Sequence, residues 1–360
     1  MRYCQRVIII EVLGVVMGVE IVYLILGLGA AFYMAWNLGA NDAANPTDTA
    51  VGAGAIKLKH AILLFAIFAA IGAITQGYMV MKTIGKGLVE PLDPLGALVA
   101  SVAAGLWVTI ATWKGMPVST THSTIGAVLG VGLAYMMFHE AVKLKWHILL
   151  AVILSWITSP LSAIMLSLIF YTLFKHLAYV LLNKGVNIDK FFRALLIYNL
   201  AFSAYSFGVN DVGNATGVYV TVVSKIFGTP DMTTMLYLSL LGSLGIALGA
   251  FTWGYRVIST VGFKITRLDY LTASSAELSN ALVVWCFSTI PKFLIGYGMP
   301  ISTTHASVSS VIGVGIAKSR SLKGVDWKVV GYIVISWILT VPIAASISFI
   351  IYIILLHLLF

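Results

Sequence analysis

Long uninterrupted apolar runs are the feature that most restricts the fold of this chain. Residues 61–81, 146–174 and 329–356 each reach or exceed the roughly 20 residues that an α-helix needs to cross a bilayer. A membrane β-barrel is built instead from short alternating strands separated by turns, and these runs are too long and too continuous for that pattern. The sequence therefore predicts an all-α polytopic membrane protein.

The composition agrees with burial in lipid. Hydrophobic residues make up 60% of the 360 residues, charged residues only 10%, and the mean hydropathy is +0.99, which is outside the range of ordinary soluble domains. The net charge of +9 shows no basic stripe interleaved with aromatics, as a nucleic-acid surface would, so it indicates a bias among loops. Cys4 and Cys286 are far apart and lack a metal-binding spacing, which favours isolated thiols.

A polar word of eight residues occurs twice within apolar surroundings. It is Gly-Met-Pro-Val-Ser-Thr-Thr-His at 115–122 and Gly-Met-Pro-Ile-Ser-Thr-Thr-His at 298–305. Three successive hydroxyl residues stand where a helix is expected to begin, and the first turn of a helix carries unpaired N–H groups and partial positive charge. Such a turn readily binds anions. The predicted substrate-binding residues for a tetrahedral oxyanion are Ser119, Thr120, Thr121, His122, Ser302, Thr303, Thr304 and His305.

Other roles for these residues stay open from the sequence alone. One copy could be an ordinary N-cap of a membrane helix, and it is the second copy that favours an anion site. His122 and His305 could pack against a neighbouring carbonyl group, contact the anion directly, or handle a proton.

A second polar word, Asn-Asp-x-x-Asn-x-Thr, also occurs twice, at 41–47 and 210–216. The first copy lies in a polar, glycine-containing break at 37–47, so we expect unwound backbone that lines a cavity. Asparagine and aspartate supply the hard oxygen ligands that a small cation such as Na⁺ requires, and an ionisable group in a membrane core marks a pathway by default. The predicted cation ligands are Asn41, Asp42, Asn45, Asn210, Asp211 and Asn214. An aspartate that only caps broken helix ends and one that carries a proton are the alternatives.

The recurrence of both words in the same order indicates an internal duplication. The spacing between matched residues drifts slowly along the chain, as insertions and deletions in a duplicated half would cause. Within each half, two short apolar pieces flank the eight-residue word, which predicts a re-entrant helical hairpin. We place an N-terminal extension or helix start at 1–20, the first transmembrane repeat at 21–182, a linker at 183–193 and the second repeat at 194–360.

The basic residues suggest an orientation for this arrangement. Three crossings and one hairpin in each half make the second half inverted, so the hairpins enter from opposite sides and their tips can meet near the midplane. The loops on one side then carry nearly twice as many Lys and Arg residues as those on the other. By the positive-inside rule that side is cytoplasmic and both termini are extracytoplasmic, in the cell (plasma) membrane. The predicted cytoplasmic set includes Lys57, Lys59, Lys184, Lys190, Arg267, Lys318, Lys323 and Lys328.

These words make the chain resemble the inorganic phosphate transporter (PiT) family. Residues 39–45 and 208–214 match the family's Gly-Ala-Asn-Asp-x-x-Asn word, and residues 117–122 and 300–305 match its Pro-x-Ser-x-Thr-His word. The resemblance runs from about residue 21 to the C-terminus. It implies a cation-coupled importer of inorganic phosphate with an inverted-repeat fold, typically a homodimer. Some relatives carry a glutamate where this chain has Ala69, a difference that concerns the cation rather than the anion.

We therefore expect a secondary active transporter that imports inorganic phosphate by alternating access, coupled to Na⁺ or alternatively to H⁺. No enzymatic activity and no cofactor are expected. The competing interpretations are a carrier for another tetrahedral oxyanion such as sulfate, a passive channel, and an intramembrane hydrolase using Ser119, His122 and Asp42. The hydrolase would lack a Gly-x-Ser-x-Gly elbow. The roles of Gln76 and Glu277 stay open.

Overall fold

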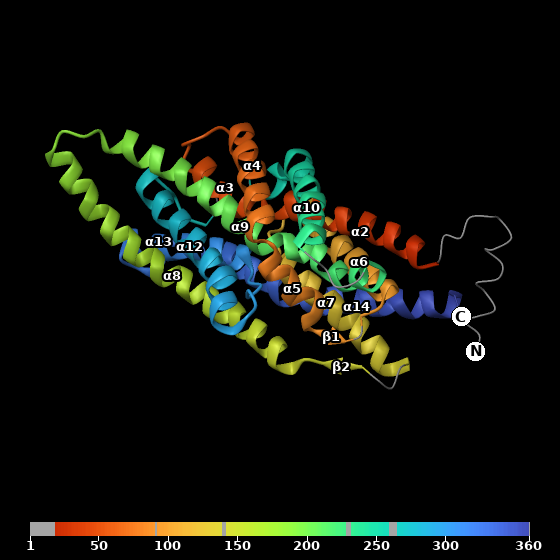
Figure 1. The fold of residues 1–360 in the computed structure, drawn as a ribbon. Coiled ribbons are helices and arrows are strands. Elements are labelled where there is room, and N and C mark those ends of the chain that lie inside the picture. Colours follow the sequence, from red (N-terminus) through yellow and green to blue (C-terminus); the bar gives the residue numbers. More distant parts are fainter. Residues whose placement is uncertain (1–18, 91, 139–141, 228–231, 259–264, 360) are drawn as a thin grey trace.

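The chain forms a bundle of long helices in the computed structural model, which describes residues 19–90, 92–138, 142–227, 232–258 and 265–359 (Figure 1). The first half consists of α2 (Val19–Asp42), α3 (Ala44–Gly52), α4 (Leu58–Gln76), α5 (Tyr78–Gly87), α6 (Pro94–Trp113), α7 (Thr120–Phe138) and α8 (Trp146–Asn183). The second consists of α9 (Ile188–Phe227), α10 (Met232–Trp253), α12 (Tyr270–Ile295), α13 (Thr303–Ser319), the 3₁₀ helix η2 (Leu322–Gly324) and α14 (Trp327–Leu359). A short antiparallel pair, β1 (Val89–Glu90) with β2 (Lys143–Leu144), joins two loops of the first half.

Seven of the described helices are long and apolar enough to cross a membrane: α4, α6, α7, α8, α10, α12 and α14. The predicted runs at 146–174 and 329–356 fall inside α8 and α14, while the run at 61–81 is divided at Gly77 between α4 and α5. The prediction of an all-α polytopic membrane protein is therefore confirmed. The predicted N-terminal extension at 1–20 lies almost entirely outside the described residues.

The two halves are joined at one end of the molecule. Residues 184–187 connect α8 to α9 there, while the start of α2 and the end of α14 both lie toward the opposite end (Figure 1). Both described ends thus lie at the same end of the molecule, as the predicted odd number of crossings in each half requires. The connection is shorter than the predicted linker, because residues 188–193 already belong to α9.

Two helix crossings of the same kind hold the halves together. α2 packs against α10, and α9, the counterpart of α2, packs against α4, the counterpart of α10. A Cβ atom added at Gly39 would lie 1.8 Å from the carbonyl oxygen of Ile246, and one added at Gly208 would lie 1.9 Å from that of Ala69. The backbones therefore touch at both crossings, which is typical of small residues at membrane helix interfaces.

Each helical hairpin packs against the long helix of the other half. α6 and α7 form the first hairpin, α12 and α13 the second; α7 lies along α14, and α13 lies along α8. The first leg of each hairpin also contacts the helix that carries an Asn-Asp word, α6 against α2 and α12 against α9. This packing brings the four polar words together in the interior.

The Asn-Asp words lie on helices that are less unwound than predicted. In the first copy only Ala43 interrupts the helix, between α2 and α3, and in the second copy residues 210–216 lie within continuous α9. The predicted break over 37–47 is therefore wrong in extent, and the second copy provides no unwound carbonyl groups. A helix keeps its backbone groups bonded to one another inside a membrane, so the side chains of these words make the contacts instead.

The glycine crossings give a test of the packing. We expect Gly39→Ala to lower the free energy of unfolding by about 1–3 kcal/mol, the usual cost of overpacking, because its added methyl group would meet the backbone of α10. Gly29→Ala on the same helix is the matched control, since a Cβ there meets nothing within 4 Å. Thermal unfolding in detergent, followed by tryptophan fluorescence, measures both variants. Equal melting temperatures for the two would contradict the close crossing.

Candidate functional site

The two eight-residue words form the starts of α7 and α13. Ser302 is the N-cap of α13, and its Oγ accepts a hydrogen bond from the backbone N–H of His305 at 3.2 Å. Ser119 Oγ accepts the same bond from the N–H of His122 at 3.2 Å. Both hydroxyl words thus stand at helix starts, where the first-turn N–H groups face the preceding loop.

The two helix starts meet inside the protein and bond to each other. Thr121 Oγ1 donates to the carbonyl oxygen of Ile301 at 2.9 Å, and Thr304 Oγ1 donates to that of Val118 at 3.1 Å. A threonine of each tip therefore holds the backbone of the other. The six hydroxyl residues of the words are all buried: Ser119, Thr120, Thr121, Ser302, Thr303 and Thr304. The structure thus brings the predicted hydroxyl groups into one interior cluster.

The first asparagine of each Asn-Asp word forms hydrogen bonds with the backbone of the tip loop in its own half. Asn41 Nδ2 donates to the carbonyl oxygen of Met116 at 3.0 Å, and its Oδ1 accepts from the N–H of Val118 at 3.2 Å. Asn210 Nδ2 donates to the carbonyl oxygen of Ile301 at 2.8 Å, and its Oδ1 accepts from the N–H of the same residue at 3.1 Å. These amides satisfy tip backbone groups that no helix or strand would satisfy.

The second asparagine of each word reaches the tip of the other half. Asn45 Nδ2 donates to Thr303 Oγ1 at 3.0 Å and to Thr304 Oγ1 at 3.1 Å. Asn214 Nδ2 donates to Thr121 Oγ1 at 2.9 Å, and its Oδ1 is buried without a hydrogen-bond partner in the described structure. The two asparagines of a word, alike in sequence, therefore bond to opposite halves.

The two aspartates lie beside these contacts, in the same cluster. Asp42 accepts hydrogen bonds from Thr120 Oγ1 at 2.5 Å and from Thr304 Oγ1 at 3.4 Å, and Asp211 accepts them from Asn214 Nδ2 at 2.9 Å and from Asn210 Nδ2 at 3.2 Å. Both carboxyl groups are at most 1% exposed. Within the described part of the chain the ion pairs lie elsewhere, between Lys145 and Glu90 and between Lys318 and Asp269. Two buried carboxyl groups without a basic partner form a cluster suited to a cation.

The imidazole rings lie on the other side of the first helical turns. The His122 ring packs in a tilted arrangement against Trp156 of α8 at a centroid distance of 3.8 Å, and the His305 ring packs in the same way against Trp337 of α14 at 3.8 Å. The two imidazoles meet edge to face at 4.5 Å. Each histidine thereby packs a hairpin against a long helix. Ser119 Oγ is bonded to a backbone N–H rather than to the imidazole of His122, so the arrangement does not support a serine–histidine hydrolase.

A second pair of buried carboxyl groups consists of Asp48 on α3 and Glu277 on α12. Glu277 is named in the sequence analysis, but Asp48 is not. Thr49 Oγ1 donates to Glu277 Oε2, and Ser307 Oγ lies 3.5 Å from Asp48 Oδ2. The remaining carboxylate oxygens, Asp48 Oδ1 and Glu277 Oε1, are buried without a partner among the described groups, and so is Asn280 Oδ1. Asp48 follows directly on the first Asn-Asp word, and this adjacency is the signal that the sequence offers for it; its counterpart by the repeat is a glycine, so comparison of the two halves does not single it out.

Known proteins resemble this chain over most of its length. The model of the phosphate transporter family matches residues 38–348. A relative from Thermococcus kodakarensis, named "Putative phosphate permease TK2061", is 35% identical over 91% of this chain and 96% of its own length. A relative from Arabidopsis thaliana, named "Inorganic phosphate transporter 2-1, chloroplastic", is 29% identical over 88% of this chain and 69% of its own length.

A solved structure agrees with the fold. It is titled "The sodium-dependent phosphate transporter" and superimposes with a TM-score of 0.80 at 32% identity, covering 93% of this chain and 99% of the other. The family match, the relatives and the seven apolar helices lead to one conclusion. The chain belongs to the phosphate transporter family, and it is a multi-pass membrane transporter rather than an enzyme.

Proposed function

We propose that this protein imports inorganic phosphate by alternating access, coupled to Na⁺, and that the cluster between the tips of α7 and α13 is its binding site. The observation that carries the proposal is the direct contact of the two tips beside Asp42 and Asp211. Two helix starts with partial positive charge favour a phosphate group, and two carboxylates favour cations. The family and the structural neighbour support both ligands.

Coupling follows from the charges in this buried space. Two carboxylates outweigh the partial positive charge of two helix starts, so an anion alone would be repelled. A cation on Asp42 and Asp211 removes that repulsion, and the phosphate in turn offsets the charge of the cation. Each ligand therefore favours the binding of the other, which is the reciprocity that symport requires.

The contacts suggest separate roles for the predicted site residues. Ser119 and Ser302 accept a backbone hydrogen bond and still carry a hydroxyl hydrogen, so we assign them to phosphate, together with the first-turn N–H groups. We assign Thr120, Thr121, Thr303 and Thr304 to the hydrogen bonds that hold the carboxylates and the tips in place. When phosphate binds, these hydroxyl groups can exchange those partners for the phosphate oxygens.

For the cation, we assign Asp42, Asp211, Asn45 and Asn214 as ligands. Asn214 Oδ1 is the best amide candidate, because it is buried and unpaired within the described structure. Asn41 and Asn210 have both sides of their amides bonded to tip backbone, which favours a positioning role over cation binding. His122 and His305 are assigned to packing against the long helices rather than to the anion.

The site is closed to both sides in this structure, since its side chains are buried and the tips bond directly to each other. Alternating access would open the tip contacts toward one side of the membrane at a time, while the glycine crossings keep α2 packed on α10 and α9 packed on α4. We further propose a homodimer in the cell membrane with extracytoplasmic termini, from the resemblance and the charge bias. Sulfate remains the rival substrate, and competition between labelled phosphate and sulfate for uptake separates the two.

The aspartates give the first test of this site. In proteoliposomes with separate Na⁺ and pH gradients, the wild type is expected to accumulate labelled phosphate when Na⁺ is higher outside. Asp42→Asn and Asp211→Asn should each lower uptake about tenfold to a hundredfold, since a contact with a charged group contributes ~1.5–3 kcal/mol. Asp189→Asn, an exposed acid on α9, is the matched control. Normal uptake by both site variants, or accumulation driven by pH alone, would contradict Na⁺ coupling through these residues.

The serines test the anion contact. Ser119→Ala and Ser302→Ala should each raise KM for phosphate about tenfold, equivalent to ~1.4 kcal/mol, while KM for Na⁺ changes less. Ser321→Ala removes a comparable cap at the surface, where Ser321 Oγ accepts from the N–H of Lys323, and it should leave both constants unchanged. Initial uptake rates over a range of phosphate and Na⁺ concentrations give these values. If all three variants behave alike, the tip serines do not bind phosphate.

The second pair of buried carboxyl groups, Asp48 and Glu277, provides a test of the number of cations. We propose that Asp48 and Glu277, whose unpaired oxygens adjoin the site, hold a further cation during transport. Glu277→Gln should then make the dependence of uptake on Na⁺ concentration less steep while phosphate is still transported. An unchanged Hill coefficient for Na⁺ would limit the cations to Asp42 and Asp211. Asp189→Asn again serves as the control for loss of an acid.

A further inference from the structure

A pocket of about 900 Å³ lies outside the transport site, at the base of the second hairpin. Its walls come from the segment before α12, the last turn of α13, η2 and the first residues of α14. A cavity of this size accommodates a ligand with tens of atoms. Because α12 and α14 both begin here and both are long and apolar enough to cross a membrane, the pocket lies at the end of two candidate membrane spans.

The lining of the pocket is strongly basic. Arg267, Lys318, Lys323 and Lys328 contribute to it, against the single acid Asp326. The Asp326 carboxylate is already engaged, since Oδ1 accepts hydrogen bonds from the backbone N–H of Lys328 at 3.0 Å and caps the start of α14. Among the basic lining residues, only Lys318 forms an ion pair with an acid in the described part of the chain, and that acid is Asp269. The pocket therefore presents excess positive charge.

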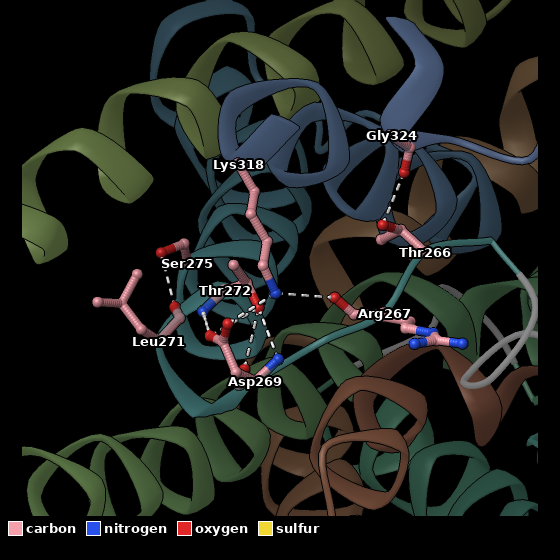
Figure 2. Close-up of polar contacts among 8 residues, drawn as sticks. All are labelled: Thr266, Arg267, Asp269, Leu271, Thr272, Ser275, Lys318 and Gly324. Carbon is pink, nitrogen blue, oxygen red and sulfur yellow. Dashed lines mark hydrogen bonds and ion pairs between the residues drawn. The ribbon is translucent and has the colours of Figure 1, made fainter. Parts of the chain in front are cut away.

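The ion pair of Lys318 closes the base of the hairpin rather than the pocket. Lys318 Nζ bonds Asp269 Oδ2 at 2.8 Å and the carbonyl oxygen of Arg267 at 3.3 Å, which ties the end of α13 to the start of α12 (Figure 2). Partial burial raises the pKa of Asp269, but hydrogen bonds from Lys318 and Thr272 outweigh this and hold it below its usual value. Figure 2 shows the guanidinium of Arg267 pointing away from this pair. Arg267, Lys323 and Lys328 are thus left for a ligand.

The walls are fixed by backbone contacts, so the basic residues are carried on an ordered frame. Thr266 Oγ1 donates to the carbonyl oxygen of Gly324 at 2.8 Å (Figure 2). The backbone N–H of Asp326 donates to the carbonyl oxygen of Ile265 at 3.0 Å. A Cβ added at Gly324 would lie 2.4 Å from the carbonyl oxygen of Gly315. The loop can lie this close to α13 because glycine has no side chain.

The corresponding base of the first hairpin is built differently. There Tyr135 Oη donates to Asp93 Oδ1 at 2.5 Å, in the place of Lys318 and Asp269. The nearby ion pair joins Lys145 to Glu90, so a basic residue at that base is paired with an acid. The basic pocket is therefore not a by-product of the duplication, and it distinguishes one end of the molecule from the other.

We propose that this pocket binds the phosphate group of an anionic phospholipid. Clusters of Lys and Arg at the ends of membrane helices attract anionic headgroups, and Arg267 provides a fork of N–H donors for phosphate oxygens. Trp327, 47% exposed, and Leu322, 63% exposed, border the basic residues and supply the apolar contact that acyl chains need. A bound lipid bridges the segment before α12 and the start of α14, and so restrains the base of the second hairpin.

Binding by the purified full-length protein tests the proposal. Dioctanoyl-phosphatidylglycerol is titrated in detergent without Na⁺ and followed by the shift in melting temperature, with dioctanoyl-phosphatidylcholine and inorganic phosphate as parallel probes. The triple variant Arg267→Gln, Lys323→Gln and Lys328→Gln should require about tenfold or more phosphatidylglycerol for the same shift. The matched control removes three exposed lysines from the same predicted side, Lys59→Gln, Lys184→Gln and Lys190→Gln. If the triple variant is not folded, the single variants Arg267→Gln and Lys328→Gln are titrated by native mass spectrometry.

Loss of the phosphatidylglycerol shift in the pocket variant, with the control and phosphatidylcholine unaffected, supports the site. Equal losses in both triple variants would mean that charge acts without a defined pocket, which overturns it. Retention of the lipid shift together with loss of the inorganic phosphate shift would reassign the pocket to a soluble anion and overturn the lipid source. Because Na⁺ is absent and no transport is measured, these outcomes do not depend on the proposed symport.

Discussion

Polar groups in the interior of a lipid-embedded bundle must find their partners within the protein, and this chain satisfies them across the boundary between its halves. The tip threonines show the principle, because Thr121 bonds the carbonyl group of Ile301 and Thr304 bonds that of Val118. Either hairpin alone would leave buried hydroxyl and carbonyl groups unpaired, at a cost of about 1–3 kcal/mol each. The cluster therefore exists only when both halves are docked, and under the proposed function the contacts that complete the fold are those that a substrate would exchange.

The helix crossings determine where those contacts occur. Gly39 and Gly208 each stand two residues before the first asparagine of an Asn-Asp word, and both lie at points of backbone contact with the other half. The close approach sets the position of α2 against α10 and of α9 against α4, so the following asparagines and aspartates arrive at the tips. Packing and chemistry are thus combined in one short word, which explains why the glycine and the acid occur together in both copies.

Much of this could be predicted from the sequence because repetition carries information about space. The two hydroxyl words and the two Asn-Asp words were expected to meet, and their side chains share one cluster. The sequence did not predict that residues 210–216 would stay helical, because glycine and asparagine signal a break unless tertiary contacts satisfy their side chains. The sequence also does not predict that Asn41 bonds to the tip of its own half while Asn45 bonds to the tip of the other half, because this depends on which half each side of the helix faces. Asp48 has no acidic counterpart in the second half, so the repeat gives no signal for it.

The departures from symmetry are therefore as informative as the repeat. The residue that matches Asp48 is Gly217, which lies against α5, where an added Cβ would be 3.0 Å from Ile84. One half thus uses this position for a buried carboxylate and the other for close packing. The hairpin bases differ as well, with Tyr135 on Asp93 in one half and Lys318 on Asp269 in the other. Under the proposed alternating access, an inverted repeat with identical halves would have equal energies when open to either side. Charged groups present in only one half separate those energies, so they are the part of the molecule that can give the two open states different affinities for ions.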